Sequence, residues 1–269
     1  MLRNLMSNDL YNNANGKQQS SLSVGQFPID LVYLWVDGSD PVWLAKKNAT
    51  LAAMNEPLHS DAATPDRFDD KDELKFSLRS VEKNMPWINH IYIVTDNQVP
   101  KWLNTENPRI SIVDHRDIVP PEYLPTFNAT ALELFLHKIP GLSEHYIFAN
   151  DDFFAGSPLT PEFFFNPFGD PIVMIREKRY LQNIFSASGF AHAFQRRKLL
   201  GRMILNALRL VHELTGKRYY MTVCHSMEAM RKSYMEDIMS QHGDKLIPDT
   251  ATAFRKQNNI QRIFFPLYN

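Results

Sequence analysis

The chain of 269 residues is poor in several features that identify whole classes of protein. It has one cysteine, Cys224, which excludes an intramolecular disulfide and any multi-cysteine zinc site and favours a reducing compartment. Its formal net charge of −1 gives no overall field that attracts nucleic acid or an anionic membrane. No apolar run approaches the roughly 18–20 residues that span a bilayer. We therefore expect a soluble, cytoplasmic protein that does not bind nucleic acid, and peripheral membrane association stays compatible with the sequence.

Several motifs of nucleotide-binding and hydrolytic proteins are also missing. The sequence has no GxGxxG and no GxxxxGK[ST], which removes the main support for a dinucleotide fold or a P-loop. It has no GxSxG elbow, as an α/β-hydrolase would require. With 44% apolar residues, however, the chain can bury the core of one large domain, or of one domain and a subdomain.

Three regions of the chain differ in composition. Residues 1–26 are mostly polar and predict a mobile leader, because they have too few apolar side chains to offset the entropy of ordering. Residues 27–175 alternate apolar strands with amphipathic helices, which predicts an α/β core with a mainly parallel sheet. Residues 176–269 contain long helical patterns at 193–214 and 227–241, which predict a helical subdomain that covers one edge of the sheet.

Four short apolar segments of the core are each followed directly by aspartate. An aspartate is a common strand terminator, so a single case would carry no information. The carboxyl ends of parallel strands meet at the same edge of a sheet, however, and four cases predict one shared acidic site there. The predicted strands are 28–36, 91–95, 110–113 and 146–149, and the aspartates after them are Asp37, Asp96, Asp114, Asp151 and Asp152.

The adjacent aspartates 151 and 152 are the most informative feature of the sequence. Two ionised carboxylates side by side repel each other and are costly to desolvate. A bound cation, or chemistry at a phosphate group, would give the chain a reason to hold them together. The alternative for such a pair considered by itself is a solvated acidic turn.

Basic residues near the acidic segments suit a phosphate ligand. Arg67 and Arg79 bracket a helix predicted over 69–84, and the planar guanidinium group matches two phosphate oxygens. His225 follows a strand predicted at 219–224 and is predicted to open the next helix, where it could act as a general base or bind a phosphate. Surface ion pairs for the arginines and a structural role for the histidine are the alternatives.

These segments resemble the conserved blocks of the Stealth family, which comprises bacterial capsular polysaccharide phosphotransferases and the animal N-acetylglucosamine-1-phosphotransferase. Residues 29–41, IDLVYLWVDGSDP, are similar to the first block. The second block extends from RFDDKDELKFSLRSVE at 67–82 to NDD at 150–152. Residues 224–231 and 254–259 resemble a later histidine segment and a later arginine segment. No counterpart of a fourth short block is evident, which leaves a short member and a truncated chain as open alternatives.

The resemblance implies a fold of the nucleotide-sugar-transferase (GT-A-like) type with a C-terminal helical subdomain that completes the site. It implies transfer of a hexose-1-phosphate from a nucleotide-sugar donor, a UDP-hexose, to a hydroxyl of a glycan or polysaccharide acceptor in capsular or exopolysaccharide synthesis. The implied site has donor-binding residues Asp37, Gly38, Arg67, Arg79 and Asp96, a divalent metal (Mg²⁺ or Mn²⁺) at Asp151 and Asp152, and catalytic residues Asp152, His225 and Arg255.

Two other functions are compatible with the same residues. A GT-A-type glycosyltransferase also uses nucleotide sugars, but it attacks the anomeric carbon and releases the nucleoside diphosphate. A degenerate, non-catalytic glycan-binding protein would turn over no nucleotide sugar at all.

Overall fold

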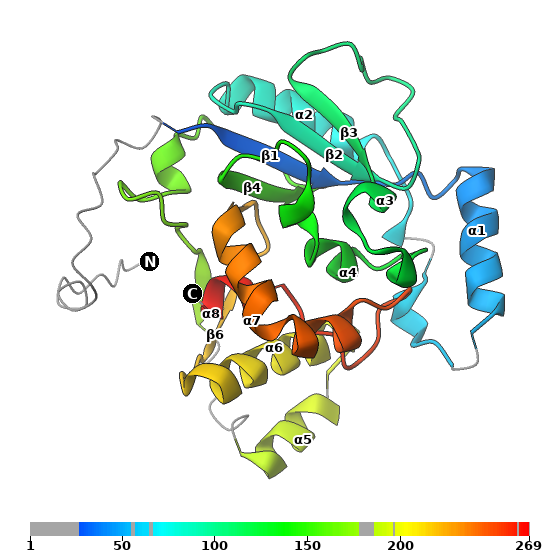
Figure 1. The fold of residues 1–269 in the computed structure, drawn as a ribbon, viewed down its shortest axis with the longest axis vertical. Coiled ribbons are helices and arrows are strands. Elements are labelled where there is room, and N and C mark those ends of the chain that lie inside the picture. Colours follow the sequence, from blue (N-terminus) through cyan, green and yellow to red (C-terminus); the bar gives the residue numbers. More distant parts are fainter. Residues whose placement is uncertain are drawn as a thin grey trace.

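The computed structural model describes residues 27–54, 57–64, 67–177, 186–195, 197–262 and 264–268. The polar leader expected at residues 1–26 lies outside the described residues. Figure 1 shows a central sheet with helices on both of its faces, which is an α/β architecture. None of the helices in the described ranges is long and apolar enough to cross a membrane.

The central sheet has five strands in the order β3-β2-β1-β4-β7. β1 to β4 pair in parallel, and β7 joins β4 as an antiparallel strand at one edge. The expected α/β fold with a mainly parallel sheet is therefore confirmed. The strands cover Ile29–Leu34 (β1), Ile91–Thr95 (β2), Ile110–Asp114 (β3), His145–Asn150 (β4) and Glu228–Arg231 (β7).

Both faces of the sheet are buried, as the near-continuous apolar runs of its strands require. Leu31 and Tyr33 of β1 point to the face covered by α2 (Glu73–Asn84). Val32 and Leu34 alternate with them and point to the opposite face, which packs against α6 (Leu199–Thr215) and α7 (Lys232–Thr250). The core consequently consists of two apolar layers with the sheet between them.

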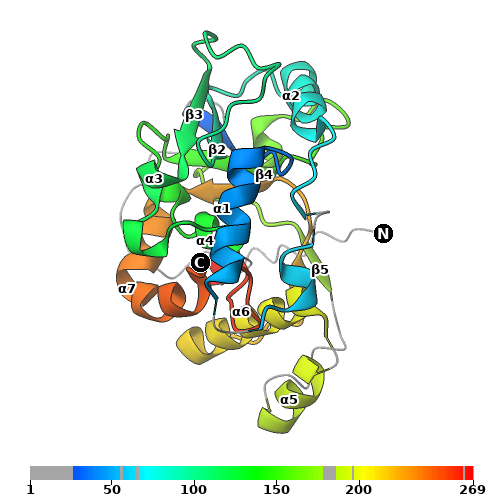
Figure 2. The same ribbon diagram turned by 90° about the vertical axis from the view of Figure 1, so that its right-hand side faces the viewer.

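The carboxyl ends of the parallel strands form one edge of the sheet. In the strand register Leu34 of β1 lies opposite both Val94 of β2 and Asn150 of β4. The loops that carry Asp37, Asp96 and Asp152 therefore leave the sheet at the same edge, as the sequence predicts. Helix α1 (Pro41–Ala52) begins beyond this edge. It lies at the right-hand side of the molecule in Figure 1 and therefore in front in Figure 2.

Two helices of the first half differ from the sequence prediction. The helix expected over 128–139 is a short α4 (Ala129–Glu133) followed by a 3₁₀ turn η5 (Leu136–Lys138). The short helix expected near Lys101 is a hydrogen-bonded turn, in which Leu103 N donates to Pro100 O at 3.0 Å. The other short elements are η2 (Ser60–Ala62), α3 (His115–Ile118), η4 (Pro121–Tyr123) and η6 (Pro161–Phe163).

The second half contains strands that the sequence prediction missed or shifted. The segment predicted as a helix over 227–241 begins as β7, because pairing with β4 outweighs its local helical pattern. The strand expected at 172–175 is shifted along the chain: the observed strand is β5 (Ile175–Glu177), and it pairs with β6 (Met221–Val223). The helix predicted over 193–214 is instead two helices, α5 (Ala187–Gln195) and α6. A last short helix, α8 (Phe264–Tyr268), ends the described chain.

Arg202 explains why α5 and α6 are separate helices. Its Nε donates hydrogen bonds to the carbonyl oxygens of Phe194 and Arg197, at 3.1 and 3.0 Å, respectively. These carbonyls lie at and just beyond the end of α5, where a helix has unpaired acceptors. Arg202 of α6 thus provides a hydrogen-bond donor to carbonyl groups at and beyond the end of α5.

Asn128 joins the first half of the chain to the segment that follows α7. Its Nδ2 donates to Thr250 O at 3.2 Å and to Asn259 Oδ1 at 3.1 Å, and its Oδ1 accepts from Thr130 N at 3.2 Å, which caps α4. Both asparagines are fully buried. The neighbouring Phe127 N donates to Ala253 O at 2.7 Å. This buried amide pair fixes the position of residues 250–259 against the sheet edge.

We expect Asn128→Ala to lower the free energy of unfolding by about 2–3 kcal/mol, because it leaves buried donors and acceptors without partners. Urea denaturation measures the change. Asn104→Ala, at an exposed turn where the side chain accepts one hydrogen bond from Glu106 N, is the matched control. Equal stability of the two variants would contradict the role of the amide pair.

Candidate active site

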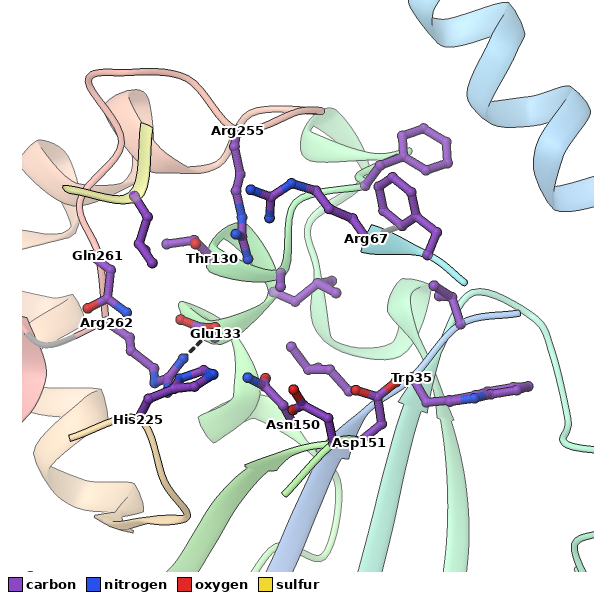
Figure 3. A pocket seen from close by; sticks show the side chains of 18 of the residues that line it. Trp35, Arg67, Thr130, Glu133, Asn150, Asp151, His225, Arg255, Gln261 and Arg262 are labelled. Atoms are coloured by element: carbon purple, nitrogen blue, oxygen red, sulfur yellow. Dashed lines mark ion pairs between the residues drawn. The ribbon is translucent and has the colours of Figure 1, made fainter. Parts of the chain in front are cut away.

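A cavity of about 680 Å³ lies at the carboxyl edge of the parallel strands (Figure 3). Its walls come from both halves of the chain: the ends of β1 and β4, the segment 67–69, α4, α6 and the segments around β6 and after α7. Polar and charged groups make up much of the lining, and Trp43, Phe127, Leu200 and Ile204 add an apolar part of the wall. The cavity is therefore enclosed only when the second half of the chain packs over the first.

Five of the predicted site residues line this cavity together: Arg67, Asp151, Asp152, His225 and Arg255. Figure 3 shows the side chains of Arg67 and Arg255 on one side and those of Asp151 and His225 across from them. The sequence separates these residues by up to 188 positions. The second half thus places His225 and Arg255 in the same cavity as the acidic pair, and their roles in the site stay predictions.

His225 reaches the cavity from a position different from the predicted one. It does not open a helix, because β7 follows it and α7 begins only at Lys232. Its ring packs edge-to-face on Phe153, with 4.7 Å between the ring centroids. Phe153 follows the acidic pair directly, so this contact ties the histidine to the loop of the carboxylates.

The acidic side of the cavity is electrostatically strained. Burial, together with the neighbouring carboxylates of Asp152, Glu73 and Asp70, raises the pKa of Asp151 from 3.8 to about 7. Asp152 is exposed to solvent at the cavity mouth. Two neighbouring carboxylates without a nearby positive charge are poised to bind a cation or to accept a proton.

The basic side of the cavity pairs two guanidinium groups. Burial, together with the nearby charges of Arg67 and Arg262, lowers the pKa of Arg255 to about 10, and Glu133 acts in the opposite direction. Arg255 has no hydrogen bond or ion pair to any residue that the structure describes. An anion between Arg67 and Arg255 would relieve this repulsion, since a guanidinium group binds phosphate oxygens in pairs.

A buried ion-pair cluster beside Arg255 was missed by the sequence analysis. Arg262 contacts Glu228 at 2.9 Å through Nη2 and Glu133 at 3.5 Å through Nη1. Burial raises the pKa of Glu133, and its Oε2 atom has no hydrogen-bond partner among the described residues. One feature of the sequence could have revealed it: Glu133 lies within the otherwise apolar segment 131–136, where a charged residue is unexpected.

His115 is a second cavity residue that sequence reasoning did not select. It is the first residue of α3 and follows β3 directly. Burial lowers its pKa to about 4, against the opposing effect of Asp96 and Asp114, so the imidazole is neutral at pH 7. A neutral ring in the wall of the cavity can donate or accept one hydrogen bond without adding charge.

Four predicted donor-binding residues lie outside the cavity lining, and each has a contact within the protein. Asp37 Oδ1 accepts from Ser39 N at 2.8 Å and from Ser39 Oγ at 2.6 Å. Asp96 pairs with Lys46 at 2.5 Å. Arg79 is exposed on α2 over the ring of Phe76. The fourth, Gly38, packs against Phe68. Donor binding by these four residues stays a prediction.

The residues at the acidic pair fit a metal that is shared with a ligand. Among the described residues, no group of three or more His, Cys, Asp and Glu side chains is arranged to hold a metal ion. Mg²⁺ commonly binds one or two carboxylates and completes its shell with water and substrate phosphates. Asp151 and Asp152 provide two carboxylates, and a divalent metal held by them stays a prediction.

Fold and cavity together define an α/β protein of the GT-A-like type whose site combines paired carboxylates with paired arginines. Two family models match the chain: "Stealth protein CR1, conserved region 1" over residues 27–55 and "Stealth protein CR2, conserved region 2" over residues 67–172. These regions contain the first acidic loop, Arg67 and the acidic pair.

Curated relatives cover most of the chain. It is 38% identical over 255 residues to the capsular polysaccharide phosphotransferase fcs1 of Haemophilus influenzae, covering 93% of this chain and 67% of the relative. It is 36% identical over 241 residues to the exopolysaccharide phosphotransferase SCO6023 of Streptomyces coelicolor, covering 87% and 38%. It is 33% identical over 256 residues to the exopolysaccharide phosphotransferase cps2G of Lactiplantibacillus plantarum, covering 87% and 73%. The chain belongs to the Stealth family.

The electrostatic state of Asp151 predicts how stability depends on pH. Its pKa is raised on folding, so its contribution to stability is fully present below about pH 4 and is lost as the pH rises through about 7. We expect Asp151→Asn to be more stable than the natural chain at pH 8, by on the order of 2 kcal/mol, and equally stable at pH 4.

Denaturant unfolding at several pH values between 4 and 8 tests this expectation. Glu106→Gln, at an exposed turn away from the cavity, controls for the change of one carboxyl group to an amide. A stability difference between Asp151→Asn and the natural chain that stays constant from pH 4 to 8 would show that the Asp151 carboxyl group is not perturbed.

Proposed function

We propose that the chain is a sugar-phosphate transferase that moves a hexose-1-phosphate from a nucleotide sugar, a UDP-hexose, to a glycan hydroxyl in capsular or exopolysaccharide synthesis. The printed names of its relatives, capsular and exopolysaccharide phosphotransferases, support the reaction class. The observation that carries the proposal is the cavity that Asp151 and Asp152 line together with Arg67 and Arg255, in which Asp151 lies across from the two arginines. A diphosphate needs positive charge around it, and an attacking hydroxyl needs a proton acceptor.

The proposed reaction is a displacement at phosphorus. The acceptor hydroxyl oxygen forms a bond to the β-phosphorus of the donor, and the bond from that phosphorus to the oxygen bridging the α-phosphate breaks. The electron pair of the broken bond leaves with the nucleoside monophosphate. The hydroxyl proton passes to a carboxylate of the acidic pair, Asp152 or Asp151.

The arginines stabilise the charge of the phosphates. Arg255 has no partner among the described residues, so it can bind the donor without first breaking an ion pair. Arg67 lies beside it and supplies the second guanidinium group. His225, held by Phe153, stabilises charge on the phosphoryl group during transfer. Phosphoryl transfer depends chiefly on such positioning and on charge stabilisation.

A divalent metal, Mg²⁺ or Mn²⁺, would be held by Asp151 and Asp152 and would neutralise phosphate charge when bound. The buried cluster of Glu133, Arg262 and Glu228 supports the neighbouring wall, because it fixes the segment after α7 against α4. The donor is thereby kept in a partly enclosed space, where electrostatic interactions are stronger than in open water.

The released nucleotide tests the reaction class. We expect a nucleoside monophosphate from UDP-sugars, identified by phosphorus NMR in the presence of Mg²⁺ or Mn²⁺ and a glycan acceptor. A nucleoside diphosphate would instead indicate a glycosyltransferase that attacks the anomeric carbon. Absence of both turnover and a melting-temperature shift with UDP-, GDP- and CMP-sugars would indicate a non-catalytic glycan-binding protein. Any ligand of the native state raises stability, so a donor that binds must shift the melting temperature.

The roles of the second half are tested by His225→Ala and Arg255→Ala. We expect both variants to fold and to lower kcat at least ~100-fold, the scale seen when one preorganised stabilising group is removed. Arg209→Ala, at an exposed position on α6 that pairs with Glu213, is the matched control for loss of an arginine. Near-normal turnover of both site variants would confine the active site to the sheet edge.

A further inference from the structure

We propose that Gly38 is a positioning residue for Arg67 and acts on it through the backbone of Phe68. The inference rests on the proposed function, in which Arg67 binds the phosphates of the donor. It gives Gly38 a role other than the contact with the donor that the sequence implied, because the space beside its Cα is already occupied by the protein itself.

The contact between Gly38 and Phe68 leaves no room for a side chain. Gly38 N donates a hydrogen bond to Phe68 O at 2.9 Å. A Cβ atom added to Gly38 would lie 2.2 Å from Phe68 O, 2.6 Å from Phe68 Cβ and 2.8 Å from Phe68 C. No rotamer change moves these atoms, since two belong to the backbone and the third is the Cβ. Any other residue at 38 therefore forces the loop after β1 and the backbone of Phe68 apart.

The backbone conformation of Gly38 does not itself require glycine. Positive φ values occur at Gly141, Gly169 and Gly216 among the described glycines, and Gly38 is not one of them. An alanine could therefore adopt the local conformation of the first acidic loop without strain. The requirement for glycine at 38 comes from the close approach of the second segment alone.

Phe68 is held on its other side by α1, so the segment cannot yield easily. Its ring packs against Trp43, with 5.1 Å between the centroids, and the ammonium group of Lys47 lies 4.7 Å from the ring centroid. Lys47 is buried, and burial lowers its pKa. Phe68 is thus clamped between the Gly38 backbone and α1, and its chain neighbour Arg67 extends from this clamp toward Arg255.

A methyl group at position 38 would push the carbonyl of Phe68 by nearly 1 Å to reach the 3.0 Å that real Cβ contacts respect. A displacement of this size is transmitted to Arg67 through one peptide unit. Misplacement of a binding group by about 1 Å can cost on the order of 10²-fold in rate. Gly38 would consequently affect phosphate binding without touching the phosphate.

The test uses inorganic pyrophosphate as the probe and isothermal titration calorimetry as the measurement. Gly38→Ala and Arg67→Ala are each compared with the natural chain, and the double variant completes a mutant cycle. We expect each single variant to weaken pyrophosphate binding about 10-fold or more, as loss of a charge-assisted hydrogen bond does. The double variant should bind no more weakly than Arg67→Ala, because Gly38 acts only through that arginine.

Gly156→Ala is the matched control, since a Cβ at Gly156 meets nothing within 4 Å and its φ is not positive. It should bind pyrophosphate like the natural chain. If Gly38→Ala is unstable in buffer, all variants are titrated in a stabilising osmolyte such as sucrose, which favours the folded state.

Three outcomes overturn the inference. Pyrophosphate affinity of Gly38→Ala within twofold of the natural chain would show that the contact does not position Arg67. Losses that add fully in the double variant would show that Gly38 acts independently of the arginine, for example by direct contact with the ligand. Unchanged affinity of Arg67→Ala would overturn the proposed phosphate site as well, which distinguishes the two failures.

Discussion

Parallel pairing of β1 with both β2 and β4 is the constraint on which the site depends. It places the carboxyl end of β1 between those of its two neighbours, so the loops after all three strands leave at the same edge. Carboxylates from segments more than 100 residues apart thereby share one edge of the sheet. These carboxylates repel one another; Lys46 pairs with Asp96, whereas the acidic pair shares its cavity with Arg67 and Arg255.

The two kinds of charge in the cavity are kept apart by different local structures. The acidic pair lies on a loop fixed to the sheet and to α2, where Ser77 and Ser80 bond the backbone of Phe153 and Ala155. Arg255 lies on a segment fixed by buried asparagine amides. Neither loop relies on an ion pair across the cavity, which leaves the charges on both sides available to a ligand.

The sequence predicts the sheet well because the strands are buried on both faces and read as apolar runs. Asp37, Asp96 and Asp152 follow these strands, so their common edge is also predictable. The edge strand β7 was not predicted, because its residues pair with residues of β4 that lie 80 to 86 positions earlier, which no local pattern reveals. Glu133 and Arg262 escaped notice for a related reason: each looks like a surface charge until the other is placed beside it.

Strand β7 links the margin of the sheet to the wall of the cavity. Without β7, strand β4 would be an edge strand with unpaired backbone groups, a template for association with other chains. With β7 in place, Glu228 on that strand meets Arg262, and residues from both halves of the chain share one sheet. One short strand therefore both covers the sheet edge and holds Arg262 in the wall of the cavity.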